Sequence, residues 1–453
     1  MKKLTTSQFS PSERFIVRSM TGLSALILAI LPFHAFITVW GSTLVGNYTL
    51  LRLWKECILA VLLIGAAVLA VNMLRAEQDI RAAMRRQPLL LLIGAYIILL
   101  AGSGAASVVS GAVTPKAFAY GLLLDSRFLI FFIVTWLVAR RSSWLVDHWR
   151  QLLLLPAAIV VVFGLLQATL LPADFLRHFG YGADTIDAVQ TIDQKSTYQR
   201  IQSTLRGANP FGAYLIIIIS ALAVLASRAS PKRWLYIVSL AAACAALAMT
   251  FSRSAWLGTT LALAWLTWWS ISSNKVRKGL LIGGSLLCML LLVAGYALRD
   301  NDVFQNTILH TDENSRSASS SNEGHLTASR DGLIDILRQP QGGGTGSAGP
   351  ASAYNDSKPA RIAENYYLQL GQEAGVIGML LFAAINLLVA QRLWQRRHAR
   401  LPQILLASLV GISLVALLSH VWTDDTLSYV WWGLAGAAIG GIAVRRTGSR
   451  DVS

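Results

Sequence analysis

Residues 88–107 read PLLLLIGAYIILLAGSGAAS, twenty residues without a single charged side chain. An α-helix needs about 20 apolar residues to cross the ~30 Å hydrocarbon core of a bilayer. The stretch follows the basic sequence RAAMRRQ at residues 81–87, and arginine accumulates on the cytoplasmic side of membrane helices. It therefore predicts a membrane-spanning helix that starts on the cytoplasmic side.

Comparable apolar stretches recur along the whole chain of 453 residues, of which 54% are hydrophobic and only 14% are charged. A soluble domain carries about 25% charged residues, so the composition excludes a soluble globular protein. The stretches also lack the alternation of apolar and polar residues that is typical of an outer-membrane barrel. We predict an all-α polytopic membrane protein with about 12 transmembrane helices. The predicted spans are 21–40, 54–74, 88–107, 118–139, 152–171, 209–227, 234–251, 254–272, 279–298, 366–390, 402–421 and 427–444.

Of the 39 lysines and arginines, 24 fall in the two terminal segments and in every second connection between these spans. This is the distribution that the positive-inside rule gives when the N- and C-termini are both cytoplasmic. The net charge of +16 is thus a signal of topology. A nucleic-acid partner is not expected, because the sequence shows no contiguous basic face with stacking aromatic residues. The short outer connections hold few basic residues: Arg52, Lys55, Lys116 and Arg253.

Two connections on the outer side are too long to be simple links. The first, residues 172–208 between helices 5 and 6, contains a run of mixed charge. The second, between helices 9 and 10, contains the amphipathic piece SRDGLIDILRQ and the glycine cluster GGGTGSAGP. We therefore predict helices 1–9 in residues 1–298, an extracytoplasmic loop in residues 299–365, and helices 10–12 with a short cytoplasmic tail in residues 366–453.

Neither a disulfide framework nor a metal site is expected. All three cysteines lie in apolar stretches: Cys57, Cys244 and Cys288. His420, Asp424 and Asp425 share the outer turn before the last span, but their spacing is not specific for a metal. The first apolar run lacks a signal-peptide cleavage sequence and is followed by further spans, so we interpret it as the first helix.

Polar residues gather at the outer ends of helices in three clusters, and the first is RIQSTLRGANPFGAYL at residues 200–215. Asn209 and Pro210 suit a helix start, which presents Arg200 and Arg206 beside a helix N-terminus. Amide groups and the helix dipole favour anions at such a position. An ordinary capped helix start with interfacial arginines is the alternative interpretation.

The second cluster is TFSRSAWLG at residues 250–258, a tight outer turn in which Ser252 and Ser254 flank Arg253. An arginine held between two membrane helices is costly without a partner, and a guanidinium binds phosphate well. The cluster indicates anion binding, with anchoring at the interface as the alternative.

The third cluster is RIAENYYLQLGQEAGVIG at residues 361–378. Glu364 and Asn365 stand at a predicted helix start and Tyr367 at interface depth, while Glu373 lies deeper. A dipole-favoured cap and an aromatic belt are the alternative roles for the first three. The glycines of this cluster form a small-residue face that permits close helix packing.

Asp125 and Arg127 lie within the fourth predicted span, where neither can face lipid at low cost. We interpret them as a structural ion pair, and a functional role for the two charges is the alternative.

At the three clusters the chain resembles the O-antigen ligase and polymerase family of integral membrane glycosyltransferases. The matching pieces are STLRGANPFGAYL, TFSRSAWLG, and QGGGTGSAG followed by AENYYLQLGQEAGVIG. They occur in the family's order, and the resemblance extends in detail from Arg200 to Leu388. It implies a multi-pass protein of the bacterial cytoplasmic membrane with its active face outside the cytoplasm.

The resemblance implies transfer of a glycan from an undecaprenyl pyrophosphate carrier, without metal, nucleotide sugar or other cofactor. Ligases pass the glycan to a lipid A core sugar or a protein, whereas polymerases pass it to another carrier-linked repeat unit. Family arginines hold the pyrophosphate, which assigns Arg206 and Arg253 to catalysis. The implied substrate-binding residues are Arg200, Asn209, Ser252, Asn365 and Tyr367.

The chain departs from the family at one position. Members commonly carry His-Asn-x-Tyr-Leu at the start of this helix, with the histidine as proposed base, and here Glu364 replaces the histidine. A carboxylate can accept a proton from a sugar hydroxyl. We expect an inverting displacement in which Glu364 activates the acceptor and Arg206 and Arg253 stabilise the leaving pyrophosphate.

Two other functions fit an all-α membrane protein. A lipid-linked oligosaccharide flippase or another secondary transporter would place its polar residues near the bilayer midplane, where only Asp125 and Arg127 qualify. A structural assembly subunit would leave Arg253 without a role. The clustering of polar residues at one face favours the enzyme.

Overall fold

The computed structural model describes residues 10–75, 87–192, 195–228, 230–270, 321–355 and 360–441, with a few single residues between 273 and 301. The first half contains α1 (Pro11–Ile30), η2 (Leu31–Phe33), α2 (His34–Val45), α3 (Tyr48–Leu51), α4 (Trp54–Arg75), α6 (Pro88–Val109), α7 (Pro115–Ala139), α8 (Trp144–Asp147), α9 (Trp149–Thr169), η3 (Phe175–Phe179), β1 (Gln190–Ile192) and β2 (Lys195–Arg200). The second half contains α10 (Ala208–Ala226), α11 (Arg233–Met249), α12 (Arg253–Ser270), α15 (Ser321–Arg338), η5 (Gly349–Tyr354), α16 (Tyr366–Gln395), α17 (Arg400–Ala416), η6 (Val421–Thr423) and α18 (Asp425–Gly440).

The expectation of an all-α membrane protein is confirmed. In the described part of the chain, 7 helical segments are long and apolar enough to cross a membrane. Every predicted span except 279–298 coincides with a described helix. That span, and Cys288 within it, lie outside the described residues, so the count of about 12 helices and the place of the long loop remain predictions.

The first span is longer than predicted and is bent. Helix α1 begins at Pro11, where the Ser10 side chain accepts a hydrogen bond from the Glu13 amide. Pro32 then interrupts the α-helical hydrogen bonds, and the chain passes through η2 into α2. The sequence pattern of hydrophobicity does not reveal such a bend, because apolar residues continue through it.

The centre of the bundle is built on α7 and α18, which are buried along most of their lengths. Two glycines of α18 allow the two backbones to approach closely. A β-carbon at Gly436 would lie 2.3 Å from the Phe132 carbonyl oxygen, and one at Gly440 would lie 2.3 Å from that of Trp136. Small residues let membrane helices pack in this way. Helices α12 and α17 cross likewise, at Gly258 and Gly411.

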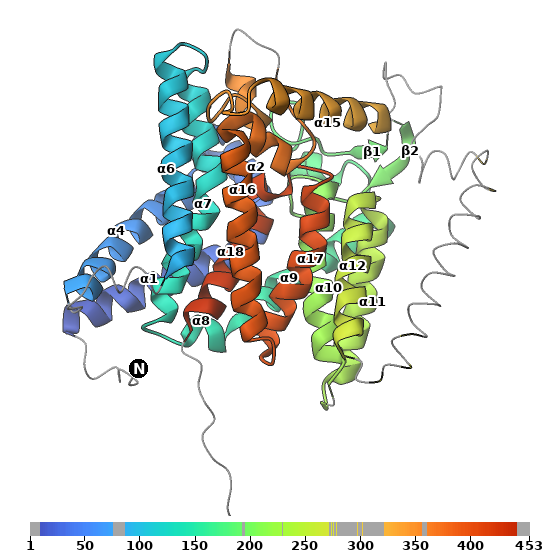
Figure 1. The fold of residues 1–453 in the computed structure, drawn as a ribbon. Helices are drawn as coiled ribbons and strands as arrows, with labels where there is room; N and C mark the ends of the chain where they lie inside the picture. Colours follow the sequence, from blue (N-terminus) through green and yellow to red (C-terminus); the bar gives the residue numbers. More distant parts are fainter. Residues whose placement is uncertain are drawn as a thin grey trace, which may run out of the picture.

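Helix α15 lies across one end of the bundle (Figure 1), and we call this the α15 end. The antiparallel hairpin β1–β2, in which Gln190 pairs with Arg200, lies at the same end. The Gln190 side chain accepts a hydrogen bond of 2.8 Å from the amide of Ala208, the first residue of α10. The hairpin thus supplies a hydrogen-bond acceptor to the first turn of α10. Helix α8 lies at the opposite end of the bundle.

Candidate active site

Backbone strain marks all three sequence clusters. Among the described residues other than glycine, φ is positive at Ser203, Phe251 and Glu364, with values of 55°, 48° and 52°. Each cluster contains one of them. A left-handed conformation costs an ordinary residue about 1–2 kcal/mol, and such strain gathers at functional sites. Each of the three clusters therefore combines polar side chains with one strained backbone position.

The first and second clusters are joined directly. The Arg200 guanidinium donates to the Thr250 carbonyl at 2.8 Å and to the Asn209 side-chain oxygen at 2.5 Å. Asn209 therefore does not cap α10, as the sequence suggested, because its side chain is turned toward Arg200 and Gly207 is the cap residue. Arg253 is half-buried at the start of α12, three residues beyond Thr250.

The segment His420–Asp425 joins the first and third clusters. The His420 Nδ1 atom lies 3.8 Å from a Glu364 carboxylate oxygen. Four residues later, Asp424 accepts a hydrogen bond of 3.1 Å from the Arg206 Nε atom. Its other carboxylate oxygen accepts the amide of Leu427 and so caps α18. Through this segment, the predicted base and a predicted phosphate ligand are tied to one short piece of chain.

A network of buried charges lies beside this segment. Lys55 Nζ is 3.1 Å from Glu56 and 3.2 Å from Asp425. Arg127 binds the same two carboxylates and also donates to the Thr423 carbonyl at 2.9 Å. His34 Nε2 lies 3.3 Å from Asp425. The side chains of Lys55 and Arg127 are only 3% exposed, so the two cations depend on these partners.

The predicted ion pair between Asp125 and Arg127 is wrong. Asp125 is fully buried and accepts a hydrogen bond of 3.0 Å from the Tyr366 hydroxyl. Arg127 turns instead toward Glu56 and Asp425. Residues two apart on a helix point in different directions. Asp125 and Arg127 of α7 therefore contact different parts of the bundle.

A cavity of about 340 Å³ adjoins the charge network, and Arg127 and Asp425 belong to both. Its charged lining comprises three arginines and two aspartates: Arg52, Arg127, Arg206, Asp187 and Asp425. Tyr48, Tyr120 and Gln190 add hydroxyl and amide groups. The lining thus has a surplus of positive charge and many hydrogen-bond donors, a combination that suits phosphate oxygens. Neither Arg200, Arg253 nor Glu364 is among the described residues that line it.

Two arginines at this cavity have N–H groups that make no hydrogen bond with the described residues. Arg206 is 44% exposed, and within the described chain only its Nε atom makes a hydrogen bond. Arg52 forms no salt bridge with another described residue, although the Asp425 charge is near enough to act on it. Arg52 donates to the Tyr120 hydroxyl at 3.4 Å and lies 5.5 Å from the centre of the Tyr48 ring. Both guanidinium groups can therefore bind an anion that enters the cavity.

The glycine cluster of the long loop docks beside the membrane helices at a break in α16. Gly375 has φ 70° and ψ −175°, which interrupts the helix. The amide of Val376 donates to the Pro340 carbonyl, and the amides of Gly343 and Gly344 donate to carbonyls of the turn before the break. The buried Glu373 carboxylate accepts the Gly346 amide at 3.0 Å. The predicted small-residue face therefore describes only part of this region, because Gly375 serves backbone geometry.

The predicted polar residues of the third cluster have structural contacts. Asn365 caps α16 by accepting the amides of Tyr367 and Leu368, and its side chain donates to the Leu417 carbonyl at 3.0 Å. The ring of Tyr367 packs 6.0 Å from that of Phe382. In the second cluster, Ser252 is buried at the close approach of α12 to Gly212. The use of these three residues in substrate binding remains a prediction.

A comparison with family models gives one match. Residues 238–383, about a third of the chain, match the model described as O-antigen ligase. The resemblance to the O-antigen ligase and polymerase family is confirmed over this part of the chain. Among curated proteins, none matches the chain.

The family match and the site overlap only in part. The match includes Arg253, Glu364, α15 and the break in α16, but it ends before His420 and does not reach Arg206. The cavity is lined mainly by residues that the O-antigen ligase model does not cover. Most of the charged surroundings of the site are thus visible only in the structure.

Arg52, Lys55 and Glu56 were not identified as parts of the site from the sequence, although one signal pointed to the first two. Arg52 and Lys55 are two of the few basic residues in short outer connections, against the positive-inside rule. His420 carried no comparable signal, because a single histidine in a turn has no pattern. A metal role for His420, Asp424 and Asp425 gains no support, since the described residues contain no group of three or more suitable ligands.

Proposed function

We propose that the protein transfers a glycan from an undecaprenyl pyrophosphate carrier to an acceptor hydroxyl, as an O-antigen ligase or a polysaccharide polymerase. The single observation that carries the proposal is the arginine-lined cavity, tied through His420–Asp425 to Glu364. An anion site and a proton acceptor on one short segment are what this displacement requires. The membrane helices supply the bilayer environment in which a polyprenyl carrier resides.

The cavity receives the phosphates of the donor. Arg206 and Arg52 offer guanidinium nitrogens to the pyrophosphate oxygens, and the Arg127 guanidinium forms part of the same cavity wall. Charge builds on the bridging oxygen as the sugar leaves, so fixed cations stabilise the transition state more than the ground state. Arg253, at the start of α12, supports the same leaving group from the second cluster.

Glu364 accepts the proton of the attacking hydroxyl. The acceptor oxygen forms a bond to the anomeric carbon on the face opposite the phosphate, and the bond between that carbon and the phosphate oxygen breaks. The hydroxyl proton passes to the Glu364 carboxylate, and the pyrophosphate leaves on its carrier. His420, 3.8 Å away, orients the carboxylate. The configuration at the anomeric carbon is therefore inverted.

The α15 end is the extracytoplasmic face in this proposal. The three clusters, the hairpin and α15 all belong to the predicted outer segments, whereas the basic connections belong to the opposite face. The active face is thus turned away from the cytoplasm in the inner membrane of a bacterium. No metal or nucleotide sugar takes part.

The test is turnover of an undecaprenyl pyrophosphate oligosaccharide by the purified protein in detergent, without metal or nucleotide, followed by mass spectrometry. Arg206→Gln is expected to lower the rate about 10²–10³-fold, the usual effect of removing one charged contact to a developing anion. Lys116→Gln is the matched control, because Lys116 is another outer basic residue and packs on the Tyr354 ring instead of lining the cavity.

The products separate the two subtypes. A ladder of longer carrier-linked glycans identifies a polymerase, and a glycan moved to lipid A core or protein identifies a ligase. Movement of intact carrier-linked glycan across vesicle membranes, without any new glycosidic bond, would replace the proposal with a flippase.

A further inference from the structure

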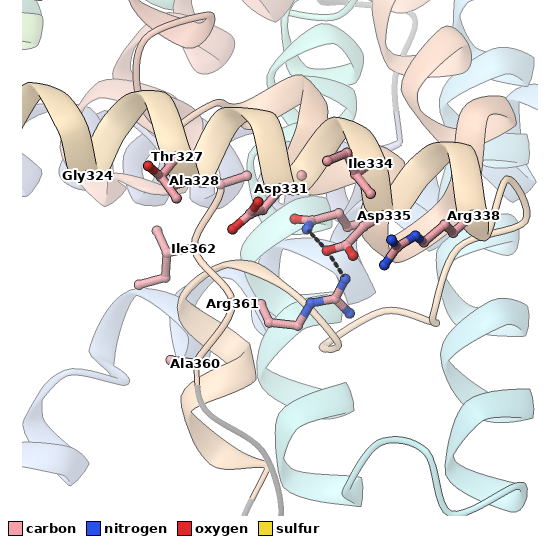
Figure 2. A pocket seen from close by; sticks show the side chains of 13 residues that line it. Gly324, Thr327, Ala328, Asp331, Ile334, Asp335, Arg338, Ala360, Arg361 and Ile362 are labelled. Carbon is pink, nitrogen blue, oxygen red and sulfur yellow. Dashed lines mark hydrogen bonds and ion pairs between the residues drawn. The ribbon is translucent and has the colours of Figure 1, made fainter.

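A second polar space lies at the α15 end, separate from the arginine-lined cavity. It is a groove of about 780 Å³ between α15 and the extended segment Ala360–Ala363. Figure 2 shows Asp331, Asp335 and Arg338 along one side of α15 and Arg361 across from them. None of the described residues that line this groove also lines the arginine-lined cavity.

The two sides of the groove are held in place by packing and by an ion pair. Helix α15 packs on α16 through Gly332, which lies against Ala363 and Leu368, and through Ile336, which is buried against Gly371. Asp335 binds Arg361 and accepts a hydrogen bond of 2.8 Å from Gln372. Burial opposes ionisation of Asp335, but these two partners hold its pKa below the ordinary value. The contact between α15 and the opposite wall is therefore a charged one at neutral pH.

The polar groups of the groove are balanced in charge. Its described lining contains two aspartates and two arginines, together with Thr327 and Gln372. Asp335 and Arg361 are paired with each other, whereas Asp331 and Arg338 have no hydrogen bond or ion pair among the described residues. Ile362, 39% exposed, adds an apolar surface beside them. The groove thus offers both acceptors and donors, without the positive surplus of the cavity.

We infer that this groove binds the saccharide chain of the acceptor. Saccharides present many hydroxyls, each a donor and an acceptor, together with apolar ring faces. Carboxylate, guanidinium and amide groups next to an exposed isoleucine match that chemistry. A phosphate group would be attracted by Arg338 and repelled by Asp331 to a similar degree, so an anion is a poorer match.

The position of the groove agrees with this role. Its lower wall ends at Ala363, the residue before Glu364. An acceptor chain bound along α15 is therefore delivered next to the proposed base, while the donor phosphates occupy the separate cavity. This inference rests on the proposed function, because it assigns the second substrate of the same reaction.

The test compares Asp331→Asn with Arg330→Gln in the turnover assay. Asp331 lines the groove, whereas Arg330 is exposed on the same helix and does not. Asparagine at this position still accepts a hydrogen bond but lacks the charge, and a hydrogen bond to a charged group is about twice as strong as a neutral one, so binding should weaken by about tenfold. We expect Asp331→Asn to raise KM for the acceptor about tenfold and to leave KM for the donor and kcat within about twofold. Arg330→Gln should change none of them.

A binding measurement separates this inference from the proposed function. Saturation-transfer NMR on the full-length protein, without donor, uses two probes from native cells: the oligosaccharide released from the carrier lipid and the core oligosaccharide freed of lipid A. Signal from the repeat-unit probe alone indicates a polymerase acceptor, and signal from the core probe alone indicates a ligase acceptor. Either signal should weaken in Asp331→Asn and persist in Arg330→Gln.

Failure takes a different form for each claim. If the protein turns over the donor but Asp331→Asn keeps the parental KM for the acceptor, or if neither probe binds, the groove assignment is wrong and the proposed function stands. If no donor is turned over while Asp331→Asn weakens probe binding, the proposed function fails and the groove remains a saccharide site. Equal melting temperatures of the two variants confirm that each is folded.

Discussion

Glu364 combines a strained backbone with the position of the proposed base. Its φ of 52° is unusual for a glutamate, and the turn that it makes leads directly into the Asn365 cap of α16. The side chain faces His420 from another part of the chain. We therefore expect that the Glu364 side chain has a role that outweighs the cost of the strained turn.

Replacement of Glu364 by glycine tests this conclusion. Glycine adopts positive φ without steric cost, although it is also more flexible in the unfolded chain. The Glu364→Gly variant should therefore unfold at a temperature no lower than the parent, with a gain of up to ~1 kcal/mol. Its transfer rate should fall about 10²–10⁴-fold through loss of the base.

The control for this prediction is Ile362→Gly, at a nearby position with ordinary φ. Only added backbone freedom and a lost side chain act there, so its melting temperature should fall. A larger loss of stability in Glu364→Gly than in Ile362→Gly would contradict the strain argument. Thermal unfolding in detergent, followed by circular dichroism, gives both values.

A site residue could be predicted from the sequence where its neighbours in the chain already indicated its role. Arg206 and Glu364 were identified from their clusters, and the structure ties both to His420–Asp425. Arg52 was visible as a misplaced charge, but its place at the cavity depends on the fold of α3 and α7. The partner of Arg127 could not be derived from sequence, because Asp425 lies almost 300 residues away and Asp125 appeared closer.

Helix α16 is the element on which the loop and the site depend. The break at Gly375 frees backbone amide and carbonyl groups of α16. The glycine cluster of the loop forms hydrogen bonds with these groups. Unpaired backbone groups at membrane depth are tolerated only when protein surrounds them. The docked loop supplies these partners and fixes the start of η5 near α7.

Substitution of Gly375 by alanine should therefore be severe. A β-carbon there would lie 2.4 Å from the Pro340 carbonyl oxygen, and the backbone conformation is accessible only to glycine. We expect a loss of about 3 kcal/mol in the free energy of unfolding, measured by thermal unfolding in detergent.

Gly102→Ala in α6 provides the comparison, because no atom lies within 4 Å of the added carbon. Alanine is favoured over glycine within a helix by about 0.5–1 kcal/mol, so this variant should be as stable as the parent or more so. Equal effects of the two substitutions would show that the break in α16 is not required.

The helices whose position follows from the pattern of hydrophobic residues were predicted well. The spans follow from apolar length, and the amphipathic piece SRDGLIDILRQ does form the second half of α15. The break in α16 was not predicted, since apolar residues continue through Gly375 and the cause is a loop 30 residues earlier in the chain. The short hairpin was not predicted either, because its mixed-charge sequence carries no clear strand pattern.

At the scale of the whole molecule, the central prediction is orientation. The positive-inside rule places the α15 end outside the cytoplasm. In a background with its three cysteines replaced by serine, Leu337→Cys on α15 should react with a membrane-impermeant maleimide in intact spheroplasts. Leu337 is 72% exposed, so the reagent has access to it.

His398→Cys, in the connection between α16 and α17, reports on the opposite face. It should react only after the membrane is permeabilised. The reverse labelling pattern would place the site in the cytoplasm and would remove the support for an extracytoplasmic transferase.

The global architecture was accessible from composition and charge because a membrane restricts the possible folds. The meeting of distant segments at one site was not. Residues from the first two spans, the fourth span and the last connection surround one cavity, and no local pattern records such an arrangement. The family resemblance supplied the chemistry but covered the segments unevenly.

The salt bridges of Asp425 also bear on the biosynthesis of the protein. Lys55 and Arg127 enter the membrane early in translation, whereas their partner Asp425 follows 370 residues after Lys55. At about 5–20 residues per second, the ribosome needs on the order of 20 to 70 seconds to supply it. During that interval, two cations lie in a half-built bundle with Glu56 as their only carboxylate from this network. A nascent chain that stalls before its final helix thus carries an exposed polar defect, which membrane quality control can recognise.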